Sequence, residues 1–297
     1  MNPYRDAPAL RRALETRLRQ ESERNGTDLG RLRRRAVFER IAVRLGADPE
    51  QGWVRKGGAV LEFRLADRAR ATKDLDIAVR AEPAAAGPVR ELLIETLLED
   101  PDQDRFSFAV SEPSPLSADS AGRPAWRFTV QADLAGKVFA KVRLDVVARD
   151  EELAAVERIR LPGMLEFAQA PAREAVAVAR RQHFAEKLHA LTRDYDDCPN
   201  TRTKDLVDLV LLIDTGLGAD RALVETTQHV FRVRDTHPVP ERLPELPPQW
   251  ETGYAELARE LAVPVDELGG ALELLRTFWR TALDGHAPLN SHEDTEG

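Results

Sequence analysis

Hydrophobic and polar positions follow two different periods along this chain, and the change of period separates helices from strands. Apolar side chains three or four positions apart predict a helix, whereas apolar side chains at every second position predict a strand. On this basis we expect two helices between residues 7 and 46, interrupted by Gly26 and Gly30, and another over residues 89–99. Residues 54–65 fit either a short helix or a strand. Strands are predicted over residues 74–79, 106–110, 126–132 and 137–147.

The second half of the chain has a helical period almost throughout. Helices are predicted over residues 172–193, 204–214, 219–233, 250–261 and 265–283. The mixture of helices and strands before residue 165 predicts a mixed α/β or α+β domain over residues 1–165. A helical domain over residues 166–297 is then expected to follow it.

Length and charge narrow the class of protein. With 297 residues, of which 42% are hydrophobic, the chain can build one large domain or two modest ones. Its formal net charge of −8 excludes a globally basic nucleic-acid-binding protein. Arginines gather locally near the N-terminus, at Arg31, Arg33, Arg34 and Arg35. This cluster is either a phosphate-binding surface or a solvated helix face.

The single cysteine and the distribution of apolar residues indicate where the protein works. Cys198 has no partner for an internal disulfide, which fits a reducing compartment. The N-terminus lacks the apolar core of a signal peptide, and no apolar run approaches the roughly 20 residues that span a bilayer. We therefore expect a cytoplasmic protein without a membrane partner.

Three acidic residues on predicted strands carry the clearest chemistry. Asp74 and Asp76 are one residue apart on a strand, so their side chains point to the same face. Such a pair is either two solvated acids or a site for Mg²⁺, which prefers carboxylate oxygens and substrate phosphates. Asp145 lies on another apolar strand and would join them if the two strands are neighbours. Upstream, Gly57 and Gly58 would let backbone approach phosphates closely.

Two later segments add charged groups at helical spacing. Lys187 lies beside an apolar stripe, where a lysine either extends to solvent or faces a triphosphate. Asp205 and Asp208 are three residues apart and therefore share one face of a helix. Acids near a helix N-terminus are also common partners of the helix dipole, so this pair has a structural explanation as well.

The order of these motifs resembles the AbiEii/AbiGii toxin family of nucleotidyltransferases, which includes the MenT-type toxins of type IV-like toxin–antitoxin pairs. The resemblance covers about residues 36–215 and follows five short motifs in the family's order. The motifs are Lys56-Gly-Gly, Thr72-x-Asp-x-Asp, the strand acid Asp145, Ala185-Glu-Lys-Leu-x-Ala-Leu and Arg202-x-Lys-Asp-Leu-x-Asp-Leu. Thr72 and Lys73 depart from the family's commonest residues, serine and glutamate.

The resemblance implies a fold, a site and a reaction. The fold would be a DNA polymerase β-like nucleotidyltransferase core, a mixed sheet flanked by helices, followed by an α-helical C-terminal domain that completes the active site. Its catalytic residues would be Asp74, Asp76, Lys187 and Asp205. Nucleotide binding would involve Lys56, Gly57, Gly58, Thr72 and Asp208. The metal ligands would be Asp74, Asp76 and Asp145. Mg²⁺ would be the cofactor and a nucleoside triphosphate (NTP) the co-substrate.

The implied reaction is nucleotide transfer to the 3′ end of tRNA, which would block aminoacylation and translation. The N-terminal arginines and the pair Arg180 and Arg181 would follow the RNA backbone. A cognate antitoxin and a monomeric chain are also expected.

Two other functions remain open. The acceptor could be a hydroxyl of a protein or a small molecule, or the chain could be a nucleotide-binding regulator without catalysis. We also expect Thr72 to be exposed beside the acids, where phosphorylation would set negative charge against them and switch the site off.

Overall fold

The computed structural model describes residues 4–79, 85–116, 124–148, 151–195 and 201–286. The chain divides into two compact units, Met1–Ala179 and Arg180–Gly297. Helices of the first unit are α1 (Ala7–Asn25), α2 (Leu29–Leu45), α3 (Gly57–Leu65) and α4 (Ala86–Leu98), with short 3-10 helices η1 (Pro49–Gln51), η2 (Ala66–Arg68) and η3 (Glu166–Ala168). Its strands are β1 (Trp53–Lys56), β2 (Asp74–Val79), β3 (Phe106–Val110), β4 (Ser114–Pro115), β5 (Ala125–Leu134), β6 (Lys137–Ala148), β7 (Val156–Arg160) and β8 (Glu174–Val178).

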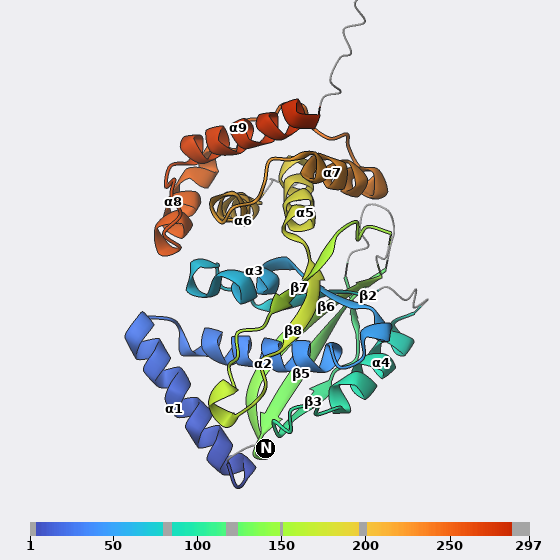
Figure 1. The fold of residues 1–297 in the computed structure, drawn as a ribbon, viewed down its shortest axis with the longest axis vertical. Coiled ribbons are helices and arrows are strands. Elements are labelled where there is room, and N and C mark those ends of the chain that lie inside the picture. The colour runs from blue at the N-terminus through green and yellow to red at the C-terminus, as the bar shows by residue number, and fades with distance from the viewer. Residues whose placement is uncertain (1–3, 80–84, 117–123, 149–150, 196–200, 287–297) are drawn as a thin grey trace, which may run out of the picture. The chain divides into compact units, whose positions relative to one another are not determined.

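Within the described residues, the strands of the first unit form one mixed sheet in the order β3-β5-β6-β2-β1-β8-β7, and β4 pairs with β5. The pairs β2–β6 and β1–β8 are parallel, and the remaining pairs are antiparallel. Helix α2 packs against β6 and β8, and α1 and α4 pack against α2 (Figure 1). The predicted α+β class with a mixed sheet flanked by helices is thus confirmed for this unit.

The two faces of the central strands differ in chemistry because side chains alternate along them. Leu75 and Ile77 of β2 are fully buried in the main hydrophobic core, which also contains the apolar side chains of α2. Asp74 and Asp76 point to the opposite face and are partly exposed. This opposite face is called the acid face below. Its next position on β2 is Ala78, which packs in a small separate apolar cluster.

Strands β5 and β6 form a hairpin. Leu134 pairs with Lys137, and the two turn residues, Ala135 and Gly136, have positive φ angles of 58° and 67°. Two consecutive positive φ angles are typical of a type I′ turn, whose twist matches that of antiparallel strands. The hairpin fixes which residues of β5 face those of β6.

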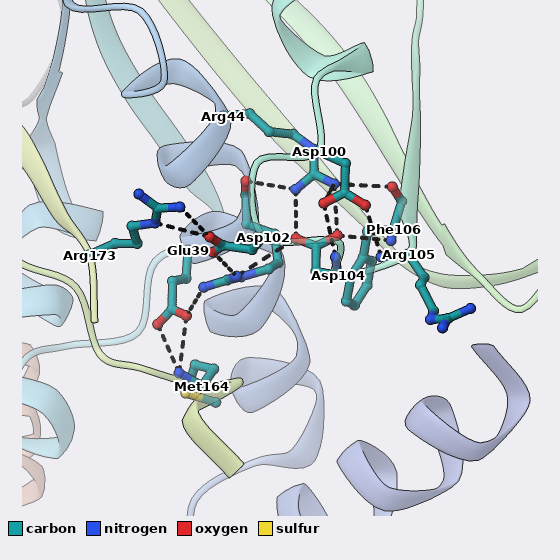
Figure 2. Close-up of polar contacts among 10 residues, drawn as sticks. Glu39, Arg44, Asp100, Asp102, Asp104, Arg105, Phe106, Met164 and Arg173 are labelled. Carbon is teal, nitrogen blue, oxygen red and sulfur yellow. Dashed lines mark hydrogen bonds and ion pairs between the residues drawn. The ribbon is translucent and has the colours of Figure 1, made fainter. Parts of the chain in front are cut away.

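A buried ionic network fixes the turn between α4 and β3 to helix α2 (Figure 2). Both Nη atoms of Arg44 donate to the carboxylate of Asp104 at 2.7 Å, and Asp104 is almost fully buried. Asp102 accepts from Arg173 at 2.6 and 2.9 Å. Glu39 accepts the backbone N–H of Met164 on both oxygens at 3.0 Å. These pairs explain how a helix rich in arginine can lie inside the unit, because each buried charge meets an opposite one.

Strand β8 corrects the sequence prediction. Residues 172–193 were expected to form one helix, but residues Glu174–Val178 form a strand that pairs with β1 and β7, and helix α5 begins at Arg180. The segment Glu-Ala-Val-Ala-Val is short and alanine-rich, so its local pattern does not distinguish a strand from a helix; the sheet partners decide. The first unit therefore continues to Ala179, beyond the expected end near residue 165.

The described part of the second unit is helical. Its helices are α5 (Arg180–Thr192), α6 (Thr203–Asp214), α7 (Arg221–Arg234), α8 (Glu251–Glu260) and α9 (Leu268–His286), with the 3-10 helix η4 (Pro248–Trp250). Helix α5 packs against α6 and α7, and α9 packs against α6, α7 and α8. The start of α7 is fixed by Asp220, whose side chain accepts the N–H of Leu223 at 2.9 Å.

Candidate active site

The three predicted acids lie on one face of neighbouring strands. Asp76 of β2 is the register partner of Asp145 of β6, and Asp74 is the register partner of Arg143. Because β2 and β6 are adjacent and parallel, Asp145 joins Asp74 and Asp76 on the acid face. The condition that the sequence left open, the adjacency of the two strands, is therefore met. The metal-binding role of the three acids stays a prediction.

The glycine turn lies directly against this face. Gly57 has a φ angle of +66°, and a Cβ atom placed on it would lie 1.9 Å from Oδ2 of Asp76. A Cβ atom on Gly58 would lie 3.1 Å from the Cβ of Thr72. Helix α3 begins at Gly57, so its first backbone N–H groups, which lack partners within the helix, start beside Asp76. Only glycine allows this backbone to approach the carboxylate so closely.

Lys56 precedes the turn and ends strand β1. It is the register partner of Asp76 and is mostly buried. Its ammonium lies 3.7 Å from Oε1 of Glu152, a carboxylate that is fully buried. The backbone of Lys56 thus lies beside Asp76, while its charge lies near Glu152.

Thr72 supports the backbone that leads into β2. Its hydroxyl donates to the carbonyl of Asp74 at 3.2 Å, and its exposed fraction is only 8%. The expectation of an exposed threonine beside the acids is therefore wrong, because the side chain turns inward against Gly58. A kinase could not reach this hydroxyl without local opening of the segment.

Two arginines that the sequence analysis missed lie among the acids. Arg127 of β5 donates from Nε and Nη2 to the two oxygens of Asp145 at 2.8 and 2.7 Å. Arg143 of β6 forms an ion pair with Asp74. The pKa of Arg127 is raised, chiefly by its hydrogen bonding to Asp145 and also by the charges of Asp145, Asp74 and Asp76, while burial opposes the shift. The guanidinium of Arg127 therefore interacts electrostatically with all three carboxylates.

Carboxylate oxygens of Asp74 and Asp76 suit Mg²⁺, which takes oxygen ligands. Their shared face and the bare backbone of Gly57 leave such an ion and its phosphates access to the pair. Within the described residues, however, no three or more His, Cys, Asp or Glu side chains gather as a metal site. Both oxygens of Asp145 accept hydrogen bonds from Arg127.

The remaining predicted residues lie in the second unit. Nζ of Lys187 on α5 is 2.6 Å from Oδ1 of Asp205 and 2.9 Å from Oδ2 of Asp208, both on α6. Asp208 is fully buried, and Arg202 lies 3.7 Å from Asp205. The structure thus joins these three predicted residues in one ionic cluster between α5 and α6. Their roles toward a nucleotide stay predictions.

The N-terminal arginines do not form the expected phosphate-binding surface. Arg31 and Arg35 are buried, with exposed fractions of 8% and 5%. Each of the four arginines forms an ion pair: Arg31 with Glu62, Arg33 with Glu15, Arg34 with Asp28 and Arg35 with Asp67. The acids that neutralise them are distant in sequence in most cases, which is why the arginine count alone was misleading.

None of the described helices has the length and apolar character needed to cross a membrane. No curated protein matches the chain. Among solved structures, JHP933 from Helicobacter pylori matches with 15% identity and a TM-score of 0.39, covering 86% of this chain and 88% of its own. An antigenic nucleotidyltransferase-like protein from Paracoccidioides brasiliensis matches with 14% identity and a TM-score of 0.40, covering 77% of this chain and 92% of its own.

A family model gives the stronger comparison. The model of the nucleotidyl transferase AbiEii toxin, type IV toxin–antitoxin system, matches residues 43–281. The match includes the glycine turn, the acid face and the Lys187 cluster, and it extends well beyond the range of the motifs read from the sequence. Because it spans most of the 297 residues, the chain belongs to the AbiEii family of nucleotidyl transferase toxins.

Proposed function

We propose that this chain is a Mg²⁺-dependent toxin that transfers a nucleotide from an NTP to the 3′ end of tRNA. One observation supports the site most strongly: Asp74 and Asp76 share a face directly beside the side-chain-free backbone of Gly57. Paired carboxylates and a bare helix N-terminus suit a metal-bound triphosphate, because the carboxylates attract the cation and the N–H groups attract the phosphates. Asp145 lies in register beside the pair.

We further propose that the first unit is a DNA polymerase β-like nucleotidyltransferase core. A mixed sheet flanked by helices supports this, as does a glycine turn that joins β1 to α3 just before the acidic strand β2. In such a core the sheet serves as a rigid platform, so the carboxylates keep their spacing when the nucleotide binds.

Different residues of the first unit would have different roles in the reaction. When bound, Mg²⁺ neutralises phosphate charge and favours attack by a hydroxyl. Asp74 and Asp76 would hold the cation, and the first N–H groups of α3 would orient the phosphates. The 3′-hydroxyl of the acceptor would then attack the α-phosphorus, forming one P–O bond while the bond to pyrophosphate breaks. The hydroxyl proton leaves to a base or water, and pyrophosphate departs.

The proposed acceptor does not depend on a basic surface. The N-terminal arginines no longer favour RNA, since they pair with acids inside the unit. The tRNA acceptor rests instead on the family to which the chain belongs. A type IV toxin also implies a cognate antitoxin in the same cell.

The test is transfer of label from each α-labelled NTP into three separate pools: purified tRNA, total protein and a small-molecule extract. Label in tRNA with at least one NTP, absent with Asp76→Asn, would support the proposal. Label only in protein or small molecules would replace the acceptor. No label in any pool with any NTP would argue for a nucleotide-binding regulator.

A further inference from the structure

The arrangement of cations around the acid face points to a division of labour among the three acids. Four residues are register partners on neighbouring strands: Arg127 of β5, Asp145 of β6, Asp76 of β2 and Lys56 of β1. Two positions earlier on β6 and β2, Arg143 is the register partner of Asp74. Arg127 forms an ion pair with Asp145 and Arg143 with Asp74, whereas Lys56 is the register partner of Asp76 but lies 3.7 Å from Glu152.

Arginine engages the carboxylate of Asp145 at both oxygens but that of Asp74 at only one. Arg127 engages both oxygens of Asp145 in a two-point pair, and the Asp145 side chain is only 13% exposed. Arg143 bonds a single oxygen of Asp74, and these two side chains are 44% and 28% exposed. A two-point pair between planar groups is stronger and more directional than a single contact. A metal ion could displace Arg143 readily, whereas at Asp145 it would have to share both oxygens with the guanidinium of Arg127.

We infer that Arg127 takes the place of a second metal ion, that Asp145 positions Arg127 instead of binding metal, and that the chain holds one divalent ion through Asp74 and Asp76. This inference rests on the proposed nucleotidyl transfer and refines the role of Asp145 within it. Nε and Nη2 of Arg127 face Asp145, and a guanidinium carries five N–H donors, so further donors remain to bind the triphosphate.

Charge balance supports the same division. Once the ion displaces Arg143 from Asp74, Asp74 and Asp76 together offer two negative charges, which that one divalent ion neutralises. Asp145 and Arg127 already neutralise each other. A second divalent ion at Asp145 would stand against the guanidinium of Arg127, and like charges at such distances repel strongly in a partly buried site.

The experiment counts Mn²⁺ ions bound per full-length chain by electron paramagnetic resonance, with a non-hydrolysable NTP analogue present. We expect one Mn²⁺ per chain for the wild type. Arg127→Met, which keeps the apolar stem but frees Asp145, is expected to bind a second Mn²⁺. The double variant Arg127→Met/Asp145→Asn should return to one. The control Arg158→Met breaks an exposed arginine pair with Glu174 elsewhere in the sheet and should leave the count at one.

Nucleotide affinity gives a second readout. Arg127→Met/Asp145→Asn, which cannot recruit a second Mn²⁺ at Asp145, should weaken binding of the analogue about tenfold, the effect of losing a charge-assisted contact to phosphate. Arg127→Lys retains the charge but not the two-point pair, so its affinity should lie between those of the wild type and the double variant. Unchanged affinity in the double variant would overturn the assignment of Arg127 to the triphosphate.

The metal count separates the inference from the proposed function. Two Mn²⁺ ions in the wild type and one in Asp145→Asn would make Asp145 a metal ligand; the inference would be overturned and the proposed function would stand. A wild type that binds no Mn²⁺ with the analogue would overturn both.

Discussion

The missing side chain of Gly57 matters as much as the carboxylates beside it. Its backbone has a positive φ angle, and a Cβ atom there would overlap Oδ2 of Asp76. Gly136, in the β5–β6 turn, has nearly the same φ angle but open space around it. Alanine substitutions at the two glycines therefore distinguish the free-energy cost of backbone strain, which both share, from that of a clash with Asp76, which only Gly57 has.

We expect Gly57→Ala to abolish Mn²⁺ and nucleotide binding, because Asp76 must move away from the new methyl group. Both Gly57→Ala and the control Gly136→Ala should lose about 1 kcal/mol of unfolding free energy through backbone strain, and Gly57→Ala should lose more. Calorimetric titration with the nucleotide analogue and urea unfolding would measure the two effects. Nucleotide binding by Gly57→Ala equal to that of Gly136→Ala would remove the glycine turn from the site.

Single residues were predictable where one strand alone determines their direction. The spacing of Asp74 and Asp76 sufficed to place both on one face. Arg127 could be found only through the register of β5 on β6, although the hairpin turn at Ala135 and Gly136 carried that information. The burial of Arg31 could not be predicted, because its partner Glu62 lies on another helix.

Between elements, Lys187 acts as a charged link from α5 to α6. Lys187→Met would leave the carboxylates of Asp205 and Asp208 close together without their shared lysine. We expect a loss of about 3 kcal/mol of unfolding free energy, as when one partner of a buried ion pair is removed. The double variant Lys187→Met/Asp208→Asn should lose less, since one of the two charges is gone. Urea unfolding would measure both losses.

A matched surface pair provides the control for this prediction. Arg221 pairs with Glu225 on α7 at 2.7 Å, and both side chains are largely exposed. Arg221→Met should change stability by no more than about 0.5 kcal/mol. If Lys187→Met were equally mild, the cluster would not hold α5 and α6 together.

His237, three residues beyond the end of α7 at Arg234, should set part of the pH response through its charge state. The pKa of His237 is lowered by burial and by the charges of Arg193 and Arg234. The unfolded chain therefore takes up this proton more readily than the folded chain, so stability should fall as the pH drops below 6.5, the ordinary histidine value. Melting temperatures of the wild type and His237→Gln, measured above and below that pH, would test this.

The expected result is a shallower loss of melting temperature with acidification in His237→Gln. His229→Gln, which changes a histidine within α7, serves as the control and should follow the wild type. An identical pH response in all three proteins would mean that His237 does not contribute.

Elements were predictable where the local pattern is unambiguous. Strand β2 has the predicted bounds because apolar and acidic residues alternate through most of it. Residues 54–65, open between helix and strand, contain both: β1 ends at Lys56 and α3 begins at Gly57. Strand β8 was missed because its place depends on β1, more than a hundred residues earlier in the chain. Long-range pairing is not visible in a local window.

At the scale of the whole molecule, the chain combines an acidic net charge with many internally paired arginines. The net charge is −8, and Arg31, Arg40, Arg44 and Arg127 are all engaged by carboxylates. A long basic surface is therefore not needed to explain its arginine content. The proposed activity depends instead on a compact site, in which three acids, two arginines and a glycine turn lie on one face of a sheet.

The most direct measurement is the intact mass of one purified tRNA after incubation with the protein and each NTP in turn. We expect mass increments of one nucleoside monophosphate, since pyrophosphate leaves in each transfer. Asp76→Asn should give no increment, while Glu174→Gln, which alters an exposed carboxylate on β8, should act like the wild type. An unchanged tRNA mass with every NTP, or an increment that persists in Asp76→Asn, would contradict the proposed transfer.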